Sequence, residues 1–392
     1  MKSIRFIYST FQACFSLLFW VPVFYEYQKK VGLSDLQIFQ IQGVYYAAFC
    51  FFEIPTGWLA DRLGRRQCMQ AGSLLLIGAN LFPVFLPTYL GFLSHWVLIA
   101  LSRSMISGAS SAYLYDYLSA RGEAHEYKNL EGTARAWSLG VKVISWIGIG
   151  SLMRWSFSSP YWLSAISGVL AWFFSCALPV VEISSQRPKV EMNFTAMTSY
   201  LRQQPILSLL MVQGVAIFVL VRICQVNLFQ PLLASKSFGL GSYGMIMSLI
   251  TVFEAVGSMR TSWVRRWLSD LNAVFALTVV LGAALLMLTG AGKIGTLIFL
   301  ALFSYGAGLA FPIQKQLLND AIPYPQYRAT LLSVESILDR AVCAVVALSL
   351  GAFLQAGKMN DFIIYACMGS VLATGIVLLS IKALSSRRSY AT

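Results

Sequence analysis

Long apolar runs recur along almost the whole chain, each followed by a short polar segment. An α-helix needs about 20 apolar residues to cross a bilayer, so ~33 residues per span and loop allow roughly twelve spans here. Of the 392 residues, 57% are hydrophobic and 11% charged, with a mean hydropathy of +0.68. This composition excludes an ordinary soluble domain and indicates an all-α membrane protein. We expect spans at 6–26, 37–60, 68–88, 91–119, 132–153, 158–181, 206–233, 242–263, 272–292, 294–318, 329–354 and 361–382.

One longer polar stretch divides these spans into two sets of six. It predicts an N-terminal six-helix bundle at 1–181, a linker at 182–205 with a short surface helix from about Phe194, and a C-terminal six-helix bundle at 206–392. The N-terminus is basic and precedes an apolar run without a small-residue cleavage site. We therefore interpret that run as the first span and not as a removable signal peptide.

The basic residues are distributed unequally between alternate loops. Of 29 Lys and Arg, four lie inside spans and six in the loops of one side, which leaves nineteen on the other side. Lys and Arg accumulate in cytoplasmic loops, so we expect both termini in the cytoplasm. The net charge of +13 thus reflects topology, and nucleic acid is not expected as a partner. The six basic residues in the loops of the opposite, external side are Lys29, Lys30, Arg154, Lys236, Lys293 and Lys358.

A short basic segment joins the second and third spans. It reads Gly-Trp-Leu-Ala-Asp-Arg-Leu-Gly-Arg-Arg at 57–66, with two glycines where helix ends come close and an Asp beside three Arg. This segment resembles the loop between helices 2 and 3 of the major facilitator superfamily, in a bacterial, twelve-helix, efflux-type branch. In that family the loop is a conformational latch between two halves. The latch residues implied here are Glu53, Gly57, Asp61, Arg62, Gly64, Arg65 and Arg66.

The resemblance implies the major facilitator fold, two pseudo-symmetric six-helix bundles that rock about a central site in alternating access. In that fold helices 3, 6, 9 and 12 face lipid, and the corresponding spans here carry no charge in their interior. The junction around Asn319 and Asp320 resembles bacterial members. It favours a multi-pass protein of the bacterial inner membrane.

Charged groups inside spans are costly and mark function. A proton-coupling group should be a carboxylate that gains and loses its proton near neutral pH. The segment that begins at Arg103 resembles a fourth-helix motif in which Arg is linked to proton coupling. The alternative for each residue is a structural ion pair. The proton-coupling candidates are Glu254, Asp339, Glu335, Asp116 and Arg103.

Cations outnumber acids near the expected midplane, which favours an anionic or zwitterionic substrate. Neutral hydrogen-bonding groups and aromatic side chains accompany them, although aromatic residues near helix ends often form interface belts. Span 5 lacks the Pro of the antiporter motif, which weakens a drug-antiporter interpretation. The substrate-cavity candidates are Arg103, Lys142, Arg222, Arg340, Gln225, Asn227, Gln314 and Tyr113.

The predicted function is secondary active transport of a small organic molecule, with protons and membrane lipids as its other partners and with a monomeric chain. The first hypothesis is proton-coupled export of a drug-like compound or a secreted metabolite such as a siderophore. The alternative is uptake or facilitated transport of an anionic metabolite. No phosphate-binding loop, nucleophile–base set or metal constellation is recognisable, so we expect no enzyme activity, no cofactor and no metal site.

Overall fold

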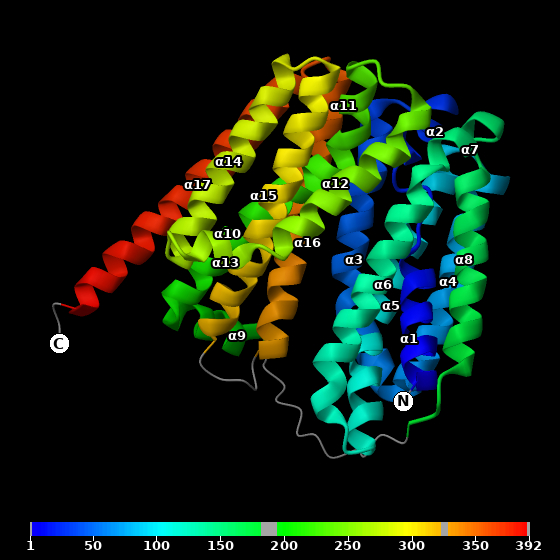
Figure 1. The fold of residues 1–392 in the computed structure, drawn as a ribbon, viewed down its shortest axis with the longest axis horizontal. Helices are drawn as coiled ribbons and strands as arrows, with labels where there is room; N and C mark the ends of the chain where they lie inside the picture. Colours follow the sequence, from blue (N-terminus) through cyan, green and yellow to red (C-terminus); the bar gives the residue numbers. More distant parts are fainter. Residues whose placement is uncertain (1, 182–193, 323–327, 390–392) are drawn as a thin grey trace. The chain divides into compact units, whose positions relative to one another are not determined.

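The computed structural model describes residues 2–181, 194–322 and 328–389, and the regular structure within these ranges is helical (Figure 1). The sequence thus correctly predicted the all-α class. The helices are α1 (Lys2–Ser16), α2 (Phe24–Lys30), α3 (Asp35–Leu63), α4 (Arg65–Phe85), α5 (Tyr89–Ala120), η1 (Ala124–Glu126), α6 (Tyr127–Ile147), α7 (Ile149–Trp155), α8 (Ser159–Ala177), α9 (Phe194–Gln203), α10 (Pro205–Arg222), η2 (Ile223–Leu228), α11 (Phe229–Ser235), η3 (Leu240–Ser242), α12 (Tyr243–Ser258), α13 (Thr261–Arg265), α14 (Asp270–Gly290), α15 (Lys293–Asp320), α16 (Arg328–Gln355) and α17 (Met359–Ser389).

Within the described ranges, nine helices are long and apolar enough to cross a membrane. The count is ten if α6, with its preceding turn, and α7, which meet at 43°, form one bent span. Ten of the twelve expected spans therefore have a counterpart. The two without one are 6–26, where the helix is interrupted, and 37–60, where α3 is 29 residues long but rich in polar side chains.

The first expected span is not a continuous helix, because α1 ends at Ser16 and α2 begins at Phe24. Pro22 lies in the gap, and proline provides no backbone N–H for a helical hydrogen bond. The prediction of a single helix over 6–26 was therefore wrong. Its freed peptide groups are satisfied by side chains from other helices, as described below.

The expected loop between the second and third spans is a single residue, Gly64. Its φ of +98° is a conformation that side chains disfavour, and it lets α3 end and α4 begin without a linker. Asp61 and Arg62 consequently belong to the last turn of α3 and not to a loop.

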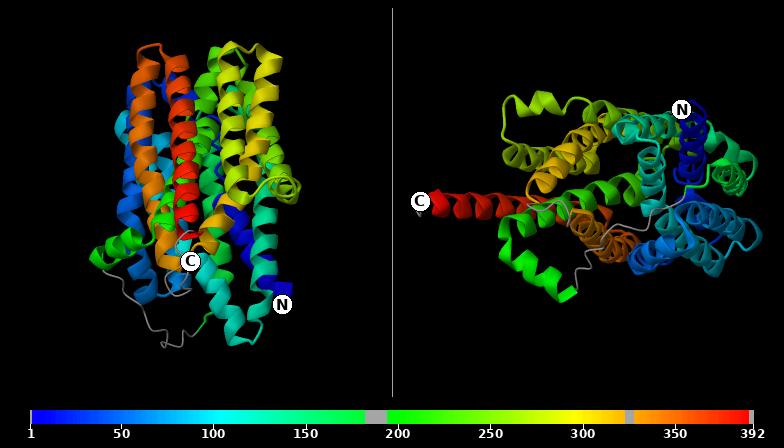
Figure 2. Two further views of the ribbon diagram at one scale, coloured as in Figure 1. Left: turned by 90° about the vertical axis from the view of Figure 1, so that its left-hand side faces the viewer. Right: turned by 90° about the horizontal axis from the view of Figure 1, so that it is seen from below.

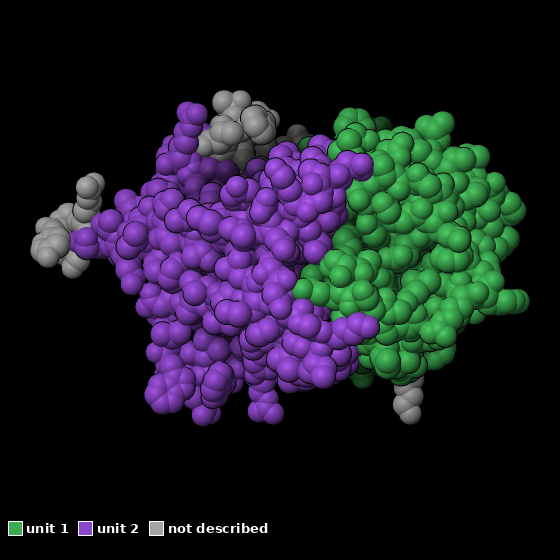
Figure 3. Space-filling model, turned by 90° about the horizontal axis from the view of Figure 1, so that it is seen from above, with its two compact units in different colours: residues 1–186, 230–248 green, residues 187–229, 249–392 purple. Residues whose placement is uncertain are grey.

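The chain divides into two compact units, coloured separately in Figure 3. Unit 1 comprises residues 1–186 and 230–248, and unit 2 comprises 187–229 and 249–392. The segment from Gln230 to Ser248 thus packs with the N-terminal helices. Most of the predicted linker, 182–193, lies outside the described residues, and α9 occupies 194–203. The predicted domain boundaries stay a prediction.

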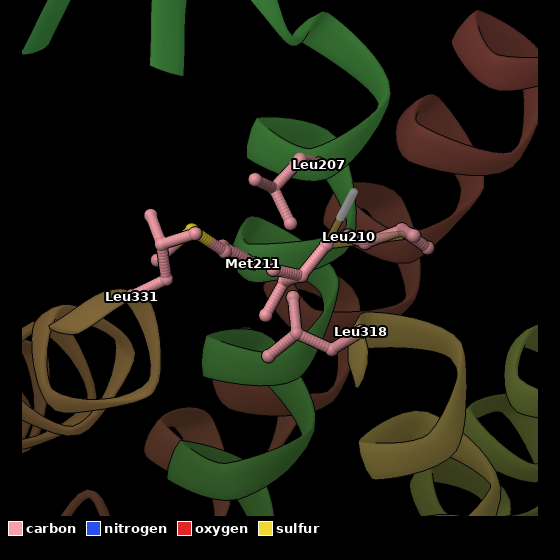
Figure 4. Packing of buried hydrophobic residues seen from close by; sticks show 6 residues of the cluster. Leu207, Leu210, Met211, Leu318 and Leu331 are labelled. Atoms are coloured by element: carbon pink, nitrogen blue, oxygen red, sulfur yellow. The ribbon is translucent and has the colours of Figure 1, made fainter. Parts of the chain in front are cut away.

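In unit 1, α5 packs on α3 and α4, while α1 packs on α6 and α8. In unit 2, α10 contacts α15, α16 and α17, and α14 packs between α15 and α17. Figure 2 shows α16 and α17 running side by side. Close to the start of α10, apolar side chains of three helices form a core (Figure 4). Its members are Leu207, Leu210, Met211, Leu318, Ile322 and Leu331.

Candidate functional site

Two carboxylates lie one helical turn apart on α16, in the interior of unit 2. Residues four apart share one face of a helix, so Glu335 and Asp339 are neighbours. Asp339 is 8% exposed, and its Oδ1 has no hydrogen-bond partner among the described residues. Within those residues neither carboxylate forms an ion pair with Lys or Arg. The arrangement leaves two acids close together in an apolar helix bundle.

Helix α10 approaches these acids at Gly214. A Cβ atom built on Gly214 would lie 2.5 Å from Glu335 Oε1 and 3.1 Å from Gln314 Nε2. The amide of Gln314 also donates to the Leu210 carbonyl oxygen at 2.7 Å, which fixes its nitrogen toward α10. A side chain at this position would push the ends of the Glu335 and Gln314 side chains away from the α10 backbone. Glu335 and Gln314 thus face one point of the α10 backbone.

Several buried polar atoms around this point lack a partner in the described chain. They include Gln314 Oε1 and both amide atoms of Gln213, a residue that is completely buried. Buried polar groups are nearly always hydrogen-bonded, to protein or to water. The unsatisfied groups of α10, α15 and α16 are therefore each available to water or to a polar ligand, and among them Gln314 lies beside Glu335 at Gly214. The polar Gln213 and Gly214 within the apolar run 205–222 were the available sequence signal, and the sequence analysis missed it.

Glu254 of α12 belongs to a second polar contact in unit 2. Gln225 Nε2 donates to Glu254 Oε2 at 2.9 Å and approaches Ser304 Oγ at 3.4 Å. Gln225 lies in the π-helical segment η2, with the fully buried Asn227 two residues later. π-Helical turns inside α-helices are frequent at functional sites. The predicted cavity residues Gln225 and Asn227 thus both belong to η2, and Gln225 contacts the predicted proton-coupling residue Glu254.

The predicted cationic residues are scattered. Arg103 is exposed on α5, and Lys142 Nζ lies 5.9 Å from the centroid of the Trp146 ring. Arg222 is the last residue of α10 and is half-buried. Arg340 Nη1 donates to the Ser336 carbonyl oxygen at 2.9 Å and also contacts Ser336 Oγ, so it bonds to its own helix.

Asp116, predicted as a proton-coupling candidate, is paired with Arg65. Its partner lies in the first turn of α4, within the predicted latch. Asp116 therefore contacts one of the predicted latch residues, and its proton-coupling role stays a prediction. Tyr113, one turn earlier on α5, donates to the Pro179 carbonyl oxygen at 2.7 Å, beside the same region.

The remaining latch residues surround the α3–α4 junction. Arg66 Nη2 donates to the Cys176 carbonyl oxygen at 2.5 Å, at the end of α8. The Arg62 guanidinium stacks 3.9 Å from the centroid of the Trp58 ring. A Cβ on Gly57 would meet nothing within 4 Å, and the side chain of Asp61 lies outside the described part of the structure. Glu53 is half-buried two turns earlier on α3.

The interrupted first span is held by side chains within unit 1. Ser164 Oγ accepts from the Phe19 N–H at 2.9 Å, and Trp146 Nε1 donates to the Leu18 carbonyl oxygen at 3.0 Å. Gln230 bonds twice: its Oε1 accepts from the Tyr25 N–H at 2.8 Å and its Nε2 donates to the Val21 carbonyl oxygen at 3.0 Å. Non-helical backbone at membrane depth is tolerated only where protein or a cavity satisfies it. Interrupted helices of this kind line binding sites in transporters.

A buried aromatic cluster surrounds Trp20, which lies within this interruption. The Trp20 ring lies 4.9 Å from His95 and 4.7 Å from Trp96, and the His95 ring lies 5.2 Å from Tyr161. Trp20 Nε1 donates to Asn80 Oδ1 at 2.7 Å, and all these side chains are at most 3% exposed. Trp20 is therefore a core residue and does not belong to a belt of aromatic side chains at the membrane interface. His95 was missed, because a single His in an apolar run has no local signal.

Helices of membrane-crossing length, with an interrupted span whose peptide groups are satisfied by side chains, indicate a polytopic membrane protein. The family model of the major facilitator superfamily matches residues 5–347, and the chain belongs to this family. It is similar in fold to the nucleoside transporter NupG, at 15% identity over 97% of this chain and 99% of that chain, with a TM-score of 0.75. A D-xylose-proton symporter has 14% identity over 96% and 97%, with a TM-score of 0.73. An auto-inhibited POT family peptide transporter has 12% identity over 97% of both chains, with a TM-score of 0.79. No curated protein matches the chain.

Proposed function

We propose that this transporter couples movement of a small organic molecule to protons, and that Glu335 and Asp339 of α16 carry the proton. The observation that supports this is the burial of Asp339 with an unpartnered Oδ1 and without an ion pair in the described chain. A buried carboxylate without a cationic partner is costly as an anion, and protonation removes that cost. Substrate or water that reaches Gln213 and Gln314 changes the same environment.

The proposed mechanism is alternating access, in which the site loads on one side of the membrane and unloads on the other. The proton neutralises the acids of α16 and so permits the state in which water is excluded. Substrate hydrogen bonds to the unsatisfied amides of α10 and α15 favour the same state. The proton and the substrate are coupled because each stabilises one conformation. The latch around Arg65 and Asp116 sets the relative stability of the two states.

The first candidate direction is export across the bacterial inner membrane, with both termini in the cytoplasm. The loop at 57–66 supports it, as a resemblance to the efflux-type branch. The cargo would be a drug-like compound or a secreted metabolite such as a siderophore, carried by a monomer. Coupling in this direction is antiport, since protons enter as substrate leaves.

The second candidate is proton-coupled uptake. The similarity in fold to a protein described as a D-xylose-proton symporter favours it. The cations Arg103 and Lys142 would then attract an anionic metabolite. The two candidates differ in the direction in which protons move relative to the substrate: opposite to it in antiport and with it in symport.

Proteoliposomes with an enclosed pH indicator test the proposal. Nucleosides, sugars, short peptides, organic anions including siderophores, and lipophilic cations are added under an imposed pH gradient. We expect one class to move protons, Asp339→Asn and Glu335→Gln to lose this movement at least tenfold, and the exposed control Asp361→Asn to keep it. Unchanged proton movement in both acid variants would refute the assignment. The gradient that accumulates substrate inside the vesicles identifies symport or antiport.

A further inference from the structure

A cavity of about 270 Å³ lies in unit 2, and neither Glu335 nor Asp339 is among the residues that line it. Its walls come from α10, η2, α14, α16 and α17. Among the lining residues only Tyr365 and Ser370 carry a hydroxyl group. The others are aliphatic residues, Phe362, Cys224 and Gly369. Such a cavity excludes water, because it offers too few hydrogen-bonding partners. An apolar ligand is the chemistry that fits it.

The mouth of the cavity is on an apolar outer face. Val342 on α16 is 39% exposed and Tyr365 on α17 is 64% exposed, and both also line the cavity. The exposed faces of these two helices continue with apolar residues such as Val345 and Met368. On a membrane-spanning helix an exposed apolar face contacts acyl chains. The cavity therefore opens toward lipid.

The volume of the cavity and the nearby charge of Lys358 indicate which kind of apolar ligand fits it. An apolar cavity of about 150 Å³ holds benzene, so this volume holds a larger apolar group such as part of an acyl chain. Lys358 is exposed immediately before α17, one helical turn from the lining residue Phe362. An ammonium group at a helix end attracts the phosphate of an anionic headgroup. We propose that the cavity binds one acyl chain of an anionic phospholipid whose headgroup is held by Lys358.

The cavity also supports the π-helical segment. Ile223, Cys224 and Leu228 of η2 line it, whereas Gln225 of the same segment donates to Glu254. An occupied cavity packs against η2 and stabilises the backbone that places Gln225 on Glu254. Lipid occupancy is thus expected to raise the transport rate; this consequence, unlike the binding itself, rests on the proposed function.

The experiment measures retained lipid by native mass spectrometry of detergent-purified protein, supplied with phosphatidylglycerol or phosphatidylethanolamine. Gly369→Phe places a ring at the mouth, where a Cβ meets nothing within 4 Å, and Ala366→Leu is a second, smaller filling variant. Ile376→Phe is the matched control, since Ile376 is 62% exposed on α17 but does not line the cavity. We expect one phosphatidylglycerol to remain on the native chain and on the control, and both filling variants to lose it at least tenfold.

Lys358→Gln should reduce the preference for phosphatidylglycerol over phosphatidylethanolamine about fivefold. Added phosphatidylglycerol should raise the melting temperature of the native chain and of Ile376→Phe, but not that of Gly369→Phe. Equal lipid retention in the control and both filling variants would overturn the site. Equal retention of the two lipids with no effect of Lys358→Gln would overturn the anionic occupant. Because binding is measured without transport, this result is independent of the proton-coupling assay.

Discussion

Arg65 and Asp116 form an ion pair between the first turn of α4 and the end region of α5, with side chains that are 17% and 13% exposed. Arg65 Nη1 also donates to the Ala112 carbonyl oxygen at 2.7 Å. The pair therefore fixes the α3–α4 junction to α5. It also places a cation against the half-buried Asp116 carboxylate.

Replacing one member of this pair should destabilise the protein more than replacing both. Arg65→Met leaves the Asp116 carboxylate in a poorly solvated place without its cation, which costs about 2 kcal/mol. Arg65→Met with Asp116→Leu should recover more than half of this loss. Unfolding in a graded denaturant series, with the two single variants and the double variant, gives the coupling free energy. Additive losses would show that the pair does not stabilise the junction.

Gln230 should be essential for the interrupted first span. Gln230→Leu removes the acceptor of the Tyr25 N–H and the donor to the Val21 carbonyl oxygen, and each orphaned group costs about 1–3 kcal/mol. Ser164→Ala orphans one backbone group of the interruption, the Phe19 N–H, so its effect should be about half as large. The hydroxyl bond to the Pro160 carbonyl oxygen is also lost, but that carbonyl lies one turn earlier in the same helix. Thermal unfolding in detergent ranks the two. A Gln230→Leu protein as stable as the native one would mean that the gap needs no side-chain support.

Gly214→Ala should impair proton coupling without unfolding the chain. The added methyl group would displace Glu335 and Gln314, which now approach the α10 backbone. We expect a tenfold or larger loss of substrate-driven proton movement in vesicles. Gly78→Ala on α4 is the matched control, since a Cβ there meets nothing within 4 Å. Its helix should gain about 0.5–1 kcal/mol, because Ala loses less backbone entropy than Gly. Equal transport by both variants would contradict the proposed site.

The sequence predicted ten spans correctly because each contains an apolar run long enough to cross the membrane as a helix. It failed at 6–26, where the backbone is interrupted and its peptide groups are satisfied by Ser164, Trp146 and Gln230. Those partners are 128 to 209 residues away. A local hydropathy window contains no information about such distant hydrogen bonds. Pro22 was the one local signal of the break.

The candidate site was predictable only in part. Glu335 and Asp339 were identifiable, since an acid in an apolar run is rare and an i, i+4 spacing puts both on one face. Asp116 looked the same from the sequence, but its cation is on another helix, 51 residues away. Gln213 and Gly214 stood out in the apolar run 205–222, but only the placement of α10, α15 and α16 shows that Glu335 and Gln314 approach Gly214. The sequence thus shows that a span contains a charged residue, whereas only the folded structure shows whether an opposite charge lies beside it.

The buried aromatic cluster leads to the last prediction. Trp20 Nε1 donates to Asn80 Oδ1 at 2.7 Å, and both residues are at most 1% exposed. Trp20→Phe keeps most of the ring packing but leaves Asn80 Oδ1 without its donor, which costs about 1–3 kcal/mol. Asn80→Leu in the same chain removes the orphaned acceptor with a side chain of similar size. The double variant should therefore melt closer to the native protein than Trp20→Phe does. If the two proteins melt at the same temperature, ring packing and not the hydrogen bond accounts for the burial of Trp20.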